Sequence, residues 1–286
     1  MKFGYTALRW GWHNLSLSSI VDSISRAGFR GADIICGKGV WGNKGEFLPF
    51  GGDKDKVLDT VSEKEVKLVA IFNFGSYIRG VDYNFWRTAG HFWWRWSQVP
   101  KIVKFANSIE CKLILAGGYP GFKRREEMEE RDYQKMARVL NQIGKVCNDY
   151  GVDVSYHPHP EPHPYTIQSR DQIDKLFELI NPDLVKFALD TGLRAGGTDL
   201  INLIQVYHDR INHVHFKDYK NGNFFDLGEG ATDFQVILKT LRSVGYDDWI
   251  IIEDWYPPVT PRDPAESAKN SRKYVEKYLA APGDMF

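Results

Sequence analysis

The stretch Ile211–Asp218, which reads INHVHFKD, contains an alternation of side chains that points to one fold. Successive residues of a strand point to opposite faces, so His213, His215 and Lys217 share one face and the apolar residues between them share the other. Such a strand suits a barrel whose interior is polar and whose outer face packs against helices. For either imidazole taken singly, the alternative is a buried, hydrogen-bonded histidine.

Seven further apolar β-rich runs accompany this one, and segments with helical periodicity separate them. The expected strands are Phe3–Ala7, Gly31–Ile35, Leu68–Phe74, Leu113–Ala116, Val152–His157, Val185–Asp190, Ile211–Lys217 and Trp249–Glu253. The expected helices include Ser16–Ala27, Asp53–Val66, Glu126–Tyr150, Ser169–Ile180, Asp199–His208, Asp233–Val244 and Pro264–Leu279.

Eight strand–helix pairs in about 250 residues predict an α/β protein with a (β/α)₈ TIM barrel, as a single domain over residues 1–286. An open doubly wound sheet is the alternative. That fold normally carries a glycine-rich phosphate loop after its first strand, whereas the residues after Ala7 read LRWGWH.

The composition limits the classes of partner and the cellular compartment. The 37 basic and 37 acidic residues give no net charge, which disfavours nucleic acid and anionic membranes as partners. No apolar run reaches the roughly 20 residues of a membrane span, and the first residues enter a strand without a signal peptide. Three widely spaced cysteines form neither a disulfide framework nor a zinc motif. We therefore expect a cytoplasmic protein.

Titratable side chains lie where four of the expected strands end, and active groups of TIM barrels gather at that end. They are His157, Asp190, His215 and Glu253, and His159 shares the face of His157. Asp190 and Glu253 each close an apolar run, which is costly for a carboxylate without a partner. Mixed imidazole and carboxylate ligands predict a divalent metal site, with Mn²⁺ favoured and Co²⁺, Mg²⁺, Fe²⁺ or Zn²⁺ possible.

Each of these groups also has a structural interpretation. Asp190 would serve as the N-cap of the following helix. Lys217 would pair with Glu253 in place of a metal. The run from His157 to Pro164, which is rich in histidine and proline, would form a rigid surface connection.

The motifs resemble those of the xylose-isomerase-like TIM-barrel superfamily of sugar isomerases and epimerases, and their style is similar to inosose (2-keto-myo-inositol) dehydratase. The resemblance rests on Tyr156–His159, Asp190–Gly192, Asp209–Asp218, Gly228–Gly230, Asp233-Phe234, Gly245-Tyr246, Trp249–Glu253 and Ala268–Tyr274. It implies that Asp190, His215 and Glu253 bind a metal. The chain departs from the family pattern at three positions, where it has His157 for a glutamate, Gly117 for a carboxylate and Leu193 for a histidine.

The resemblance implies proton abstraction beside a carbonyl of a keto-sugar or cyclitol, with lyase-type β-elimination slightly favoured over isomerisation or epimerisation through an enediolate. The expected catalytic residues are His157, His159, Lys217 and Glu253, and His213 is expected to bind substrate. A barrel that has lost catalysis and serves as a non-catalytic subunit is the remaining alternative.

The segment from Gly75 to Trp96 is long for a connection after the third strand, and it contains the cluster Phe92–Trp96. We expect a substrate-access loop in which Trp94 and Arg95 contact the substrate, together with Tyr119 after the fourth strand. Such aromatics would suit a glycoside, and the resemblance extends to C-glycoside deglycosidases, which work with a small partner chain. The alternative is a packing surface for helices or for a homo-oligomer.

Overall fold

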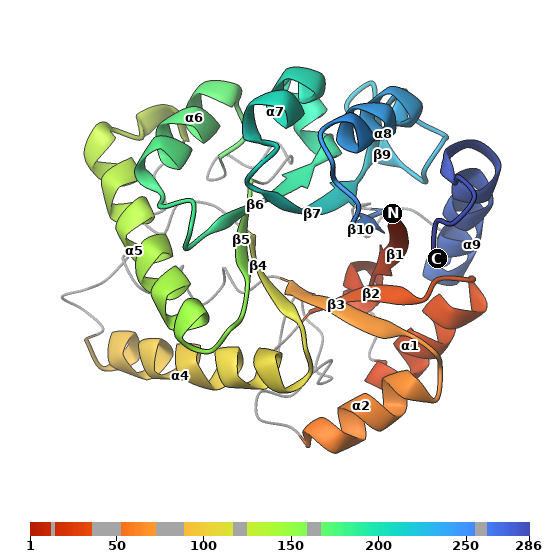
Figure 1. Ribbon diagram of the computed structural model, residues 1–286, viewed down its shortest axis with the longest axis horizontal. Helices are drawn as coiled ribbons and strands as arrows, with labels where there is room; N and C mark the ends of the chain where they lie inside the picture. The colour runs from red at the N-terminus through yellow and green to blue at the C-terminus, as the bar shows by residue number, and fades with distance from the viewer. Residues whose placement is uncertain (13–14, 36–52, 73–88, 117–124, 159–166, 255–261) are drawn as a thin grey trace.

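The computed structural model describes residues 1–12, 15–35, 53–72, 89–116, 125–158, 167–254 and 262–286. Eight parallel strands close into a barrel in the order β1-β10-β7-β6-β5-β4-β3-β2 (Figure 1). They are Lys2–Thr6 (β1), Gly31–Ile35 (β2), Lys67–Phe72 (β3), Lys112–Ala116 (β4), Val154–His157 (β5), Lys186–Asp190 (β6), Ile211–Phe216 (β7) and Trp249–Ile252 (β10). The predicted (β/α)₈ barrel is confirmed.

The helices surround this ring of strands (Figure 1). They are Leu17–Arg26 (α1), Lys54–Ser62 (α2), Ala89–Ser108 (α4), Glu130–Asp149 (α5), Arg170–Leu179 (α6), Leu200–Tyr207 (α7), Phe234–Ser243 (α8) and Pro264–Tyr274 (α9). Side-chain oxygens of Ser or Asp cap most of their first turns, for example at Ser169 and Asp263. Within the described segments, we find no helix with the length and apolarity that crossing a bilayer demands.

Two features differ from the sequence-based expectations. The expected long loop ends earlier than Trp96, because helix α4 already begins at Ala89 and includes Phe92–Trp96. Pro100 lies inside this helix, and an internal proline is a signal that normally argues against one. A short antiparallel hairpin, Asp218–Lys220 (β8) with Asn223–Phe225 (β9), also stands between β7 and α8.

The barrel interior changes from apolar to polar along its axis. Near the amino ends of the strands, Val69, Trp249 and Ile251 form a buried cluster separate from the main core. Gly31 leaves the space that the Trp249 ring fills, since a Cβ at this position would overlap the ring. Beyond this apolar floor, the barrel interior holds buried carboxylate, imidazole and ammonium groups, namely Asp33, His157, Asp190, His213, His215, Lys217 and Glu253. The fold thus places a polar cluster on an apolar base.

Candidate metal centre

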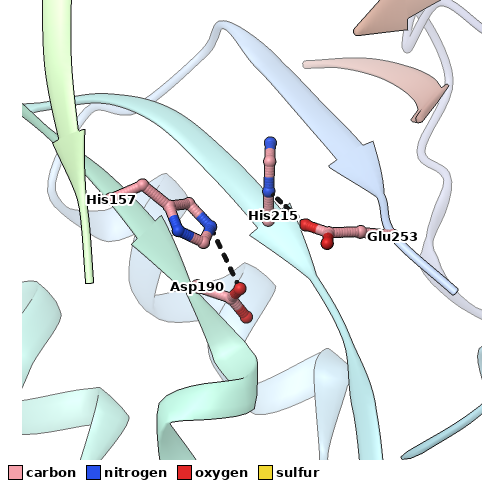
Figure 2. A group of neighbouring side chains, drawn as sticks. All are labelled: His157, Asp190, His215 and Glu253. Atoms are coloured by element: carbon pink, nitrogen blue, oxygen red, sulfur yellow. Dashed lines mark ion pairs between the residues drawn. The ribbon is translucent and has the colours of Figure 1, made fainter. Parts of the chain in front are cut away.

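Four side chains converge at the carboxyl ends of β5, β6, β7 and β10. His157, Asp190 and His215 belong to β5, β6 and β7, and Glu253 directly follows β10. Figure 2 shows the four side chains pointing toward one another. The register pairs Asp190 with His215 across neighbouring strands, and alternation turns both inward. None of the four is more than 1% exposed.

The distances within this group fit a shared ion. His157 Nε2 lies 3.0 Å from Asp190 Oδ2, and His215 Nδ1 lies 2.6 Å from Glu253 Oε2. One ligand atom from each of the four residues lies within 4.8 Å of every other. Asp190 Oδ2 and both Glu253 oxygens are buried, and their ion-pair contacts in the described part of the chain are with His157, His215 and Lys217. Two imidazoles and two carboxylates in this arrangement suit a divalent cation.

Asp190 serves as the helix cap that its sequence position suggested, and its second carboxylate oxygen is oriented toward the candidate metal centre. Its Oδ1 accepts a hydrogen bond of 2.7 Å from the backbone N–H of Gly192 and caps the 3₁₀ helix Thr191–Gly196. Its Oδ2 faces the centre. Because the capping bond fixes the carboxylate plane, the second oxygen is held toward His157 with little rotational freedom.

Lys217 is a fully buried cation beside the two carboxylates. Its Nζ lies 3.1 Å from Asp190 Oδ2 and 2.9 Å from Glu253 Oε1. Burial would raise the pKa of both acids, but the charge of Lys217 helps hold the pKa of each below its usual value. The hydroxyl of Thr191 donates to the backbone carbonyl of Lys217 and accepts from its N–H, both at 2.8 Å. The lysine backbone is thus tied to the end of β6.

The interior carries an excess of negative charge. Asp33, Asp190 and Glu253 are buried with Lys217, so these four side chains have a net charge of −2 when ionised. Burial alone would lower the pKa of His215, but Glu253 and Asp33 raise it to about 9. Burial lowers the pKa of His157. A proton on His215 would offset one of the two negative charges, and a divalent cation would offset both.

Sequence reasoning missed Asp33, which lies on β2 and contacts both histidines of β7. Its Oδ2 is 2.8 Å from His213 Nε2 and 2.9 Å from His215 Nε2. The available signal was a carboxylate inside the short run Gly31–Ile35, between apolar neighbours. Asp33 lies in the middle of its strand, whereas the active groups of a TIM barrel are expected at the strand ends.

The structure describes only some of the other residues that the sequence predicts for substrate binding or catalysis. His213 is fully buried and hydrogen-bonded to Asp33, so its ring already has a protein partner. His159 and Tyr119 lie outside the described residues. Trp94 and Arg95 belong to helix α4, but their side chains are outside the described part. The role of each in substrate binding or catalysis stays a prediction.

Comparison with known proteins agrees with this architecture. An inosose dehydratase from Lacticaseibacillus casei is 29% identical over 181 residues, covering 56% of this chain and 59% of the relative. The chain therefore spans less than two thirds of that relative's length.

Solved structures show the same fold. The probable 3-DHS dehydratase AsbF from Bacillus anthracis has a TM-score of 0.73 at 15% identity, with 97% of this chain and 100% of that chain covered. A zinc-bound protein named IOLI has a TM-score of 0.70 at 17% identity, with 96% of each chain covered. A family model matches residues 21–278, and the chain belongs to the family that this model describes, the Xylose isomerase-like TIM barrel family.

Proposed function

We propose that the chain is a divalent-metal-dependent enzyme that removes a proton beside the carbonyl of a keto-sugar or cyclitol and then eliminates a β-substituent. The observation that carries the proposal is the buried convergence of His157, Asp190, His215 and Glu253 beside Lys217. The relatives' names support this chemistry, since one is an inosose dehydratase and another a probable 3-DHS dehydratase. The zinc in the IOLI structure supports a metal-dependent site.

His157, Asp190, His215 and Glu253 would hold the ion, and the excess negative charge of the interior favours its binding. Mn²⁺ is our first choice, with Co²⁺, Mg²⁺, Fe²⁺ or Zn²⁺ as alternatives. Such an ion supplies Lewis acidity, which polarises a substrate oxygen and acidifies the neighbouring C–H bond.

The protein groups would then move two protons. We assign proton donation to Lys217, because its ammonium group is fully buried between Asp190 and Glu253 and offers protons to a departing hydroxyl. His159 is our choice for the group that accepts the proton from carbon, with His157 or Glu253 as the alternatives. Loss of one proton from carbon and gain of one by the leaving hydroxyl releases water and leaves a carbon–carbon double bond.

Several finer features belong to the proposal as predictions. Tyr119, Trp94, Arg95 and His213 would contact the substrate. We also propose a single domain over residues 1–286, a cytoplasmic location, and assembly as a homo-oligomer or with a small partner subunit.

The first test is metal content by elemental analysis of protein purified without chelator. We expect about one divalent ion per chain, lost in His215→Ala and Glu253→Ala. The matched controls are His208→Ala and Glu178→Ala, which change the same residue types at exposed positions. Absence of metal from the wild-type protein, with no uptake on titration, would contradict the proposal.

The second test separates elimination from isomerisation. The metal-loaded enzyme is incubated in D₂O with a keto-inositol, a 3-keto-glycoside or a ketose, and the substrate is followed by NMR and ultraviolet absorbance. Elimination yields an unsaturated ketone, whereas epimerisation yields a deuterated isomer without new absorbance. Deuterated isomers alone would favour the isomerase alternative. Bound metal without exchange or product on any of these substrates would favour the non-catalytic alternative.

A further inference from the structure

A carboxylate on β2 reaches across the barrel interior to both histidines of β7. Asp33 Oδ2 lies at hydrogen-bond distance from both rings, 2.8 Å from His213 Nε2 and 2.9 Å from His215 Nε2. The two Nε2 atoms are 3.1 Å apart, and all three residues are fully buried. These contacts lie on the side of His215 that faces away from Glu253.

The two ring nitrogens of His215 therefore face different partners. Nε2 points to Asp33, and Nδ1 lies 2.6 Å from Glu253 Oε2 in the candidate metal centre. Both partners are carboxylates that only accept, so the metal-free ring can donate from both nitrogens, whereas a metal ion on the Nδ1 lone pair leaves the remaining proton on Nε2 beside Asp33.

We propose that Asp33 is a positioning residue that keeps the proton of His215 on Nε2 and so turns the Nδ1 lone pair toward the metal. His213 is the second part of this device, because its hydrogen bond to the same Oδ2 fixes the carboxylate. This inference adds a residue role to the proposed function and rests on the proposed metal centre. Carboxylate–histidine–metal arrangements of this kind orient the ring and increase its strength as a ligand.

A second ion held by Asp33, His213 and His215 is the competing interpretation, since these three residues also form a compact group. The distances favour positioning, because each Nε2 lies at hydrogen-bond distance from Asp33 Oδ2, and one N–H on each ring would satisfy both contacts without an ion. The two interpretations differ in the protonation of His215 Nε2, which can be measured.

The experiment is long-range ¹H–¹⁵N NMR on ¹⁵N-histidine-labelled protein, without metal and with Zn²⁺, which is diamagnetic. The chain has eight histidines, and His213→Gln and His215→Gln assign the two resonances. We expect the zinc-loaded wild type to show His215 with a proton on Nε2 and zinc on Nδ1. Zinc affinity is measured in parallel by competition with a chelating dye.

The variant Asp33→Asn should bind zinc about 10- to 100-fold more weakly and should populate both tautomers of His215. The control is Asp132→Asn, which alters a carboxylate only 1% exposed in the first turn of α5 and should leave zinc affinity unchanged.

Several outcomes would overturn the assignment. Zinc on Nε2 of His215, or two zinc ions per chain, would show that Asp33 belongs to an ion site. Undiminished zinc affinity in Asp33→Asn would also refute the positioning role while leaving the proposed function intact. A wild type that binds no zinc or other divalent ion would instead remove the proposed function. The wild-type spectrum decides the tautomer even if Asp33→Asn does not fold.

Discussion

Replacing Lys217 by methionine tests whether its ammonium group offsets the charge of the buried carboxylates in the barrel interior. The ammonium group lies within 3.1 Å of Asp190 and 2.9 Å of Glu253 at zero exposure, so its loss leaves two buried carboxylates without their cation. Removing one partner of a buried ion pair destabilises a protein by about 3 to 5 kcal/mol. We therefore expect the free energy of unfolding of Lys217→Met to be lower than that of the wild type by this amount when a chelator is present. Proton uptake by one carboxylate would reduce the loss as the pH is lowered.

A bound divalent ion should offset much of this loss. Saturation at 1,000 times the dissociation constant stabilises a protein by about 4 kcal/mol. Because Lys217 competes with the ion for the same carboxylates, the variant should bind metal more tightly than the wild type. Its gain in the free energy of unfolding on adding metal should therefore exceed that of the wild type.

The assay is urea unfolding followed by tryptophan fluorescence, with EDTA or with saturating Mn²⁺ or Zn²⁺. Lys239→Met, on the exposed side of α8, is the matched control and should change stability by less than about 0.5 kcal/mol. A loss below about 1 kcal/mol for Lys217→Met in EDTA would show that the lysine is not the counterion. Equal metal-induced gains in the variant and the wild type would show that it does not compete with the ion.

Two further predictions concern stability away from the centre. Gly230→Ala should destabilise the protein by about 1 to 3 kcal/mol in urea unfolding, because a Cβ there would overlap the Asp218 carboxylate; an unchanged midpoint would contradict this. Burial would raise the pKa of Asp248, but the hydrogen bond and charge of Lys112 lower it. This pair therefore stabilises the fold above about pH 4 and loses its effect as the pH falls through the lowered pKa. Lys112→Met should be less stable than the wild type at pH 6, and the difference should shrink toward pH 3 in urea titrations.

The strands were predictable because each is a short buried run between turns. Trp249–Ile252 and Lys186–Asp190 lie within one residue of their expected limits, since a polar or loop residue bounds each run. Helix α4 was not among the expected helices, and Pro100 inside it is a residue that normally breaks or kinks a helix. Tertiary packing overrides such local preferences, as the buried Ile102 and Val103 on this helix illustrate.

The candidate site was predictable to the extent that it lies at strand ends. Strand alternation and the barrel order bring His157, Asp190, His215 and Glu253 together once the fold is known. Asp33 was not predictable in the same way, because its partners are 180 and 182 residues away and its register across the barrel depends on closure. Sequence spacing identifies which strand carries a group, whereas side-chain reach across the interior is a property of the packed barrel.

The charge of the completed centre also bears on the substrate. Asp33, Asp190 and Glu253 together balance Lys217 and one divalent ion, so the loaded interior is neutral. Within the described cluster, the single buried ammonium already faces two carboxylates and has no excess charge for a phosphate group. A neutral centre in a low-dielectric interior is suited to stabilise charge that develops during the reaction. An example is the negative charge on the oxygen next to the carbon that loses its proton. We therefore expect unphosphorylated keto-sugars or cyclitols to be turned over with higher kcat/KM than their phosphates, and the reverse preference would place an additional cation at the barrel mouth.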